Sequence, residues 1–172
     1  MNLKKVIRTI PDYPKKGILF YDITTLLKNK TAFKTVINAL WKKYRAKKID
    51  KVVAVDAHGF IFGAPLAHKL GVGFIPVRKK GKLPAETLGA LYTLEYGQDE
   101  LTMHKDAIEP GEKILLIDDL LATGGTISAV TEIVKKLCGK IVGIGFVIEL
   151  TFLKGIEKLK GYPVFSLIKY AK

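Results

Sequence analysis

The sequence predicts an α/β fold, in which an open, mainly parallel twisted sheet is flanked by helices. Two short aliphatic runs, residues 52–55 and 114–117, are typical of strands that are buried on both faces of a sheet. Each run is followed by a turn of small and polar residues and then by a stretch with helical periodicity. The length of 172 residues suits a single domain, 1–172, with a sizeable core.

Each expected element rests on a local pattern. Residues 11–17 combine proline, lysine and glycine, and we expect them to be irregular before the apolar run at 18–21. Residues 32–44 carry an apolar stripe at helical spacing, and Gly71 suits the end of a helix over 60–70. The remaining expected elements are a strand at 52–55, a turn at 56–59, a strand at 74–78, a basic flexible loop at 79–84, a hairpin of 91–96 with 100–104, a strand at 114–117, a helix at 127–137, and strands at 141–149 and 164–168.

The composition is that of an ordinary water-soluble protein. Hydrophobic residues make up 48% and charged residues 26%, and no apolar stretch is long enough for a membrane span or a signal peptide. The net charge of +13 would suit nucleic acid or a polyanionic substrate, but the lysines are scattered as on solvated helix faces, so we expect no nucleic-acid partner. The single cysteine, Cys138, excludes an internal disulfide and indicates a cytoplasmic protein with a buried, unreactive thiol.

The most informative stretch is residues 114–126, Ile-Leu-Leu-Ile-Asp-Asp-Leu-Leu-Ala-Thr-Gly-Gly-Thr. Asp118 and Asp119 stand where the strand is expected to end, and their carboxylates can accept hydrogen bonds from a diol. A turn of small residues then opens onto a helix, where backbone N–H groups can bind a phosphate. The turn consists of Ala122, Thr123, Gly124, Gly125 and Thr126.

Each part of this stretch has a plainer interpretation, as core, as a turn, or as helix-capping acids. Their contiguity favours a site for a ribose 5-phosphate. The turn lacks the lysine of a nucleotide-binding P-loop, which excludes that motif. Ligands of open parallel sheets bind at the carboxyl ends of the strands, so we expect residues 56–59, 78–82 and 118–126 to surround one site.

With these loops in view, the chain resembles the adenine phosphoribosyltransferase family over nearly its whole length. Besides residues 114–126, the matching segments are 7–14, 59–63, 78–84 and 94–97. The resemblance implies the type I phosphoribosyltransferase fold, with a small base-binding hood at residues 1–34 and a flexible catalytic loop and hairpin at 79–104. It also implies a homodimer that transfers ribose 5-phosphate from phosphoribosyl pyrophosphate (PRPP) to N9 of adenine, giving AMP and pyrophosphate.

The resemblance further implies residue roles. The implied PRPP-binding residues are Asp118 and Asp119 at the ribose, the turn from Ala122 to Thr126 at the 5-phosphate, and His58, Arg78 and Lys82 at the pyrophosphate. Arg78 and Lys82 act partly across a dimer interface in related enzymes. The implied adenine-binding residues are Leu19, Phe20, Tyr21 and Leu120, with Phe20 and Leu120 on either side of the base.

The reaction itself requires such groups. Displacement at the anomeric carbon passes through an oxocarbenium-like state while negative charge grows on the pyrophosphate, so Arg78, Lys82 and Mg²⁺ would stabilise the leaving group. We expect PRPP to carry the Mg²⁺, with no metal site built by the protein, and the histidines show no metal-ligand spacing. Glu95 is the candidate to orient adenine through N7 and manage its N9 proton, although it could also be a solvated hairpin residue.

Two positions depart from the family. His58 and Tyr21 stand where many members carry arginine. Histidine is shorter than arginine, is mostly neutral at pH 7 and cannot form a bidentate fork. This predicts that the KM for PRPP is raised and that it falls at lower pH. The alternative is that Arg78 and Lys82 are sufficient to bind the pyrophosphate and His58 only fills the turn. The tyrosine at position 21 in place of arginine affects which contacts the protein makes with the purine.

Two other functions remain open at this point. The same PRPP site could serve a 6-oxopurine, namely xanthine, guanine or hypoxanthine, although residues 17–20 favour adenine. The fold could also belong to a regulator that senses PRPP and binds nucleic acid. The absence of an appended DNA-binding module in the sequence, together with Glu95 and the basic loop, argues against that alternative.

Overall fold

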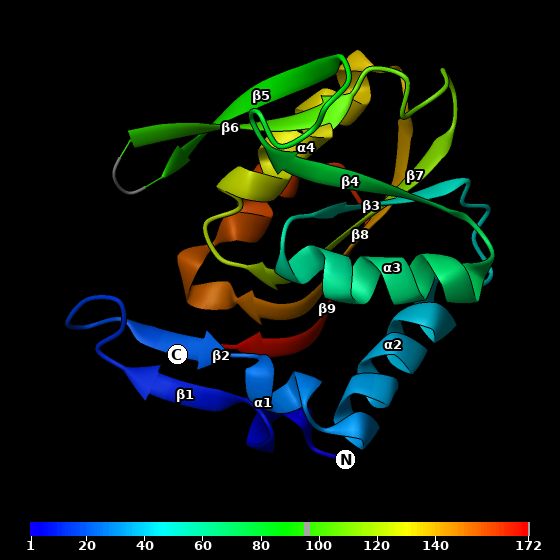
Figure 1. Ribbon diagram of the computed structural model, residues 1–172. Coiled ribbons are helices and arrows are strands. Elements are labelled where there is room, and N and C mark those ends of the chain that lie inside the picture. Colours follow the sequence, from blue (N-terminus) through cyan, green and yellow to red (C-terminus); the bar gives the residue numbers. More distant parts are fainter. Residues whose placement is uncertain (95–96, 172) are drawn as a thin grey trace. The chain divides into compact units, whose positions relative to one another are not determined.

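The computed structural model describes residues 1–94 and 97–171 (Figure 1). Contacts within the chain divide it into two compact units, residues 1–39 and 40–172, and the boundary falls inside helix α2 (Lys30–Tyr44). The expected single domain with a hood at 1–34 stays a prediction. Among the described helices, none has the length and apolarity needed to cross a bilayer.

The first unit is built on a small antiparallel hairpin. A 3-10 turn, η1 (Leu3–Lys5), precedes β1 (Arg8–Pro11) and β2 (Leu19–Asp22), which pair with Arg8 opposite Asp22. A short helix, α1 (Thr24–Leu27), follows. The α2 helix begins before the expected residue 32 because Asn29 caps it, with its side-chain oxygen accepting hydrogen bonds from the amides of Thr31 and Ala32 at 3.1 and 3.0 Å.

The second unit contains a seven-stranded sheet in the order β5-β6-β4-β3-β7-β8-β9. Strands β4, β3, β7, β8 and β9 run parallel, and the hairpin of β5 and β6 is added antiparallel at the β4 edge. The strands are β3 (Lys51–Val55), β4 (Gly73–Lys79), β5 (Thr87–Leu94), β6 (Gly97–His104), β7 (Lys113–Leu121), β8 (Lys140–Leu150) and β9 (Val164–Tyr170). The expected open, mainly parallel sheet is confirmed.

Two helices cover opposite faces of this sheet, α3 (His58–Leu70) and α4 (Gly125–Lys136) (Figure 1). The α3 helix packs closely on the face that carries Val52 and Ala54, because a Cβ added at Gly63 would lie 2.7 Å from the Cβ of Ala54. The α4 helix shares a buried core with Val53 and Val55, whose side chains point the other way. Both faces are therefore apolar, as the aliphatic runs predict.

Two boundaries near the expected site differ from the prediction. The β7 strand does not end at Ile117 but continues to Leu121, with Asp118 opposite Phe146 of β8. The two acids therefore lie within a strand rather than after it. The α3 helix begins at His58, so this residue lies in the first helical turn and not in a preceding loop.

Cys138 is exposed, so the expectation of a buried thiol is wrong. It lies two residues after Lys136, the last residue of α4, and has a φ of +59°. A residue that leaves a helix in the left-handed conformation turns the chain away from the helix axis, and the apolar stripe of α4 no longer governs its burial.

Candidate active site

A cavity of about 360 Å³ opens at the carboxyl edge of the second unit's sheet. Its lining comes from the end of β3, the start of α3, the end of β7 and the start of α4. The lining residues are Val55, Asp56, Ala57, His58, Asp118, Asp119 and Thr126. The structure thus brings together two of the three segments expected to surround one site, and the third is joined to them through Asp56.

Asp118 is the buried acid of this cavity, with 9% of its surface exposed. Its Oδ1 accepts a hydrogen bond from the backbone N–H of Asp119 at 2.9 Å. Burial, and next the neighbouring charge of Asp119, raise the pKa of the Asp118 carboxyl well above its usual range. The first turn of α3 packs directly on this acid, because a Cβ added at Gly59 would lie 3.0 Å from Asp118 Oδ1.

His58 contacts the second acid. Its Nδ1 lies 3.0 Å from Oδ2 of Asp119, and an ionised carboxylate accepts here, so Nδ1 carries the proton. The histidine side chain is 50% exposed and that of Asp119 is 19% exposed. The imidazole is therefore the more exposed member of this pair, and both residues line the cavity.

Arg78, at the end of β4, connects the segment 78–82 to the site. Its Nε donates to Oδ2 of Asp56 at 2.8 Å, and its Nη1 donates to the backbone oxygen of Lys82 at 3.1 Å. Asp56 thus holds the guanidinium, which in turn holds the loop that carries Lys82. From the sequence, Asp56 was expected only as part of the turn at 56–59. An acid that directly follows a buried strand of a parallel sheet is nevertheless a signal for a ligand site at that edge.

Two other lysines of the basic loop are paired with β6. Lys79 Nζ lies 2.8 Å from Asp99, and Lys80 Nζ lies 2.7 Å from Glu100. The hydrogen bonds to these carboxylates raise the pKa of each lysine. Of the four basic residues at 78–82, these two are thus engaged away from the cavity.

The turn from Ala122 to Gly124 leads into α4. Gly124 has a φ of +78° and caps the helix, and Ser128 N donates to its carbonyl oxygen at 3.1 Å. The backbone N–H groups at the start of α4, before Ser128, have no acceptor within the helix, as at any helix N-terminus. This end of the helix is therefore suited to bind an anion. Gly155, in the 3-10 helix η3 (Gly155–Leu159), lies against this turn. Nothing in the local sequence around Gly155 indicates that contact.

The residues expected at the base are described within their own units. In the first unit, strand β2 exposes Leu19 and Phe20 at 42% and 38%, and buries Tyr21 at 5%. Burial raises the pKa of the Tyr21 hydroxyl. In the second unit, Leu120 is half-buried on β7. Glu95 lies outside the described residues.

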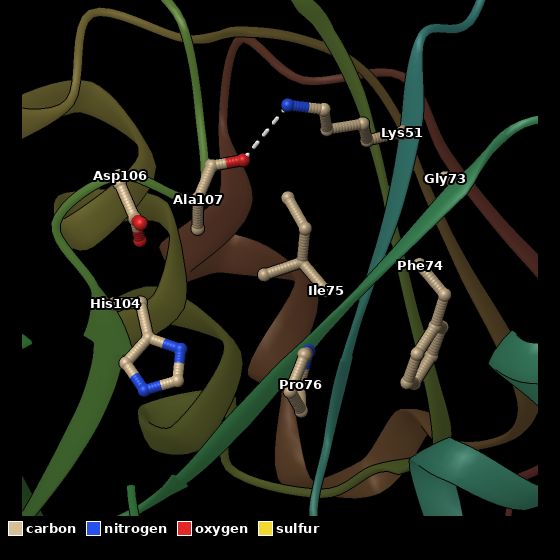
Figure 2. Close-up of a pocket in the computed structure, with 8 residues that line it drawn as sticks. All are labelled: Lys51, Gly73, Phe74, Ile75, Pro76, His104, Asp106 and Ala107. Atoms are coloured by element: carbon tan, nitrogen blue, oxygen red, sulfur yellow. Dashed lines mark hydrogen bonds between the residues drawn. The ribbon is translucent and has the colours of Figure 1, made fainter. Parts of the chain in front are cut away.

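A second hollow, of about 250 Å³, lies at the opposite edge of the sheet, where β3 and β4 begin (Figure 2). Figure 2 shows Lys51 reaching across it to the carbonyl oxygen of Ala107, at 2.9 Å. Lys51 is also paired with Glu112 at 2.8 Å. The lysine charge is therefore already neutralised. Asp106 is the one acid among the described residues that line this hollow, and none of them begins a helix. Within residues 1–94 and 97–171, no three His, Cys, Asp or Glu side chains are grouped so that they could hold a metal ion.

Comparison with known proteins agrees with the geometry. The sequence profile of the phosphoribosyl transferase domain matches residues 22–165. The adenine phosphoribosyltransferase of Clostridium botulinum strain Hall is 56% identical over 170 residues, which cover 99% of each chain.

Two crystal structures are also similar. The adenine phosphoribosyltransferase of Thermoanaerobacter pseudethanolicus has a TM-score of 0.94 and 55% identity, covering 98% of each chain. The enzyme of Saccharomyces cerevisiae, complexed with adenine and an imino-altritol bisphosphate, has a TM-score of 0.91 and 43% identity over 96% of each chain. The expected type I fold is confirmed by these matches, and the chain belongs to the adenine phosphoribosyltransferase family.

Proposed function

We propose that this chain transfers the 5-phosphoribosyl group of PRPP to N9 of adenine, releasing pyrophosphate and forming AMP for purine salvage. The observation that carries the proposal is one cavity in which the acids Asp118 and Asp119 adjoin the glycine turn at the start of α4. A diol acceptor next to an anion site matches a ribose 5-phosphate.

The two acids would bind the ribose hydroxyls and favour the charge that develops on the sugar. As the bond to pyrophosphate breaks, the ring gains oxocarbenium character, and nearby carboxylates stabilise positive charge. The turn residues Ala122, Thr123, Gly124, Gly125 and Thr126 would hold the 5-phosphate through backbone amides and threonine hydroxyls. This anchoring fixes the anomeric carbon relative to the incoming base.

Arg78, Lys82 and His58 would bind the pyrophosphate. Arg78 is already oriented by Asp56 at 2.8 Å, so its guanidinium loses little freedom when it meets an anion. Mg²⁺ is the proposed cofactor and would neutralise charge on the leaving group. The donor set fits an ion carried mainly by PRPP, because Asp56 and Asp119 already accept hydrogen bonds from Arg78 and His58 and offer few further oxygens.

The adenine would bind between Phe20 and Leu120, with the backbone of Leu19 at its edge, Tyr21 near it and Glu95 managing the N9 proton. The exposed ring of Phe20 supports this, since an exposed aromatic side chain is available for stacking. The 1–34 segment would act as the base-binding hood and 79–104 as the catalytic loop. A homodimer in the cytoplasm is also part of the proposal, and size-exclusion chromatography with light scattering tests the dimer.

A panel of four bases tests the function. The protein is incubated with PRPP, Mg²⁺ and either adenine, guanine, hypoxanthine or xanthine, and pyrophosphate release is followed. We expect turnover with adenine at least tenfold faster than with any 6-oxopurine. Faster turnover with a 6-oxopurine would show that this base, and not adenine, is the substrate. No turnover with any base would refute the enzymatic function. Glu95→Gln, which keeps the size of the side chain, should lower kcat by about 10²-fold if Glu95 manages the proton.

A further inference from the structure

The backbone of Gly155 is in direct contact with the phosphate-binding turn. A Cβ added at Gly155 would lie 2.1 Å from the carbonyl oxygen of Ala122 and 2.9 Å from the backbone nitrogen of Gly124. A Cβ added at Gly124 would lie 2.5 Å from the carbonyl oxygen of Gly155. These distances are far inside van der Waals contact, so neither position has room for a side chain.

The segment that carries Gly155 is anchored on both sides. At the far end of η3, Leu159 is 1% exposed and belongs to the same buried core as Ile127 and Val130 of α4. Before η3, the hydroxyl of Thr151 donates to the carbonyl oxygen of Tyr170 in β9 at 3.1 Å. The turn therefore lies against a backbone that cannot easily move away from it.

The two glycines meet different requirements. Gly124 needs to be glycine for its left-handed φ of +78° as well as for space. Gly155 lies in a 3-10 helix and is not among the residues with positive φ, so its conformation is open to other residues. The close approach of the turn is what requires glycine at position 155.

We propose that Gly155 is a positioning residue for PRPP: its bare backbone determines where Ala122 and Gly124 lie, and hence where the first amides of α4 meet the 5-phosphate. The inference rests on the proposed function, because it takes this turn as the phosphate site. A methyl group at position 155 displaces the Ala122 carbonyl and with it the amides. Misplacing binding groups by about 1 Å can cost about 10²-fold in activity.

Gly155→Ala tests the proposal, with Gly139→Ala as the matched control. A Cβ at Gly139 would also be crowded, at 2.9 Å from Val134 and 3.1 Å from Ile108, but these are side chains near the opposite end of α4. We expect Gly155→Ala to raise the KM for PRPP and the inhibition constant of ribose 5-phosphate about tenfold or more, while the KM for adenine changes less than about twofold. Gly139→Ala should leave all three constants within about twofold. An unchanged KM for PRPP in a folded Gly155→Ala protein, or an equal rise of both KM values, would overturn the proposal.

Hydrogen exchange of the unaltered protein tests the contact even if Gly155→Ala fails to fold. Ribose 5-phosphate should slow amide exchange in residues 122–128 and also in 151–160, and leave 139–143 unchanged. Slower exchange at 122–128 alone would overturn the role of Gly155 and keep the phosphate site. No slowing in either segment would overturn both, since the turn would not be the phosphate site.

Discussion

Nδ1 of His58 lies 3.0 Å from Oδ2 of Asp119, so a histidine at the start of α3 and a carboxylate of β7 form one hydrogen-bonded pair. The pair joins the proposed pyrophosphate site to the proposed ribose site. A proton gained by the imidazole adds positive charge beside the pyrophosphate and strengthens its bond to the carboxylate.

His58→Arg should lower the KM for PRPP about threefold or more at pH 8, because a permanent cation with several donors replaces a mostly neutral ring. Histidines gain their proton as the pH falls from 8 to 6, so the KM of the unaltered protein should fall over this range while that of His58→Arg stays flat. Steady-state kinetics at several pH values measures both. His68→Arg makes the same change at the other end of α3 and should alter neither. If His58→Arg leaves the KM for PRPP unchanged, the histidine has no part in binding pyrophosphate.

Asp118→Asn should separate stability from function. Burial raises the pKa of Asp118, so its ionised form is disfavoured in the folded state, and stability falls as the pH rises from the unfolded pKa towards the folded one. Asparagine removes that cost and can still accept the hydrogen bond from Asp119 N. We expect the free energy of unfolding at pH 7 to rise by about 1 kcal/mol and the KM for PRPP to rise about tenfold or more. Urea unfolding and kinetics test this. Asp119→Asn should also weaken PRPP binding, with a smaller gain in stability, because it removes only the neighbouring charge and leaves the Asp118 carboxyl buried.

The sheet and its helices could be predicted because their signals are local. The run at 52–55 is buried on both faces, and Gly71 ends α3 in the left-handed conformation that its position in the sequence indicated. The continuation of β7 through Asp118 and Asp119 could not be predicted in this way. Acids are disfavoured in strands, but pairing with β8 overrides this local preference.

The site residues also divide into those with a local sequence signal and those without one. Those within the 114–126 stretch were recognisable because strand, acids and turn are contiguous in the sequence. The contacts of Asp56 with Arg78 and of Gly155 with the turn join segments that are far apart in the chain. No local pattern encodes such contacts, because they depend on how separate loops approach one another in the folded sheet. The roles assigned to these residues stay predictions until the variants are measured.

Cys138 should react as an accessible thiol without any effect on the reaction. It is exposed, and the 12 residues of α4 place it about 18 Å from the phosphate-binding turn. One equivalent of an aromatic disulfide reagent should react per folded chain, and the modified protein should keep its kcat and KM for PRPP. Cys138→Ser should take up no reagent and keep the same activity. A thiol that reacts only after denaturation would show that this surface is covered in solution.

Acid should destabilise the first unit through Asp22. Hydrogen bonds from Thr24 and Arg8 lower the pKa of Asp22 to about 2, and the Arg8 side chain is 57% exposed, which weakens its share. A lowered carboxyl pKa stabilises the fold above the unfolded pKa of about 4, and this stability is lost as the pH falls towards 2. Between pH 5 and pH 3 the protein should therefore lose about 0.5–1 kcal/mol more unfolding free energy than Asp22→Asn does. Urea unfolding at both pH values measures the difference, with the exposed Asp106→Asn as control. An equal loss in Asp22→Asn would mean that the bonds to Arg8 and Thr24 add no stability, and the β1–β2 hairpin would then be held by its backbone pairing and the burial of Tyr21.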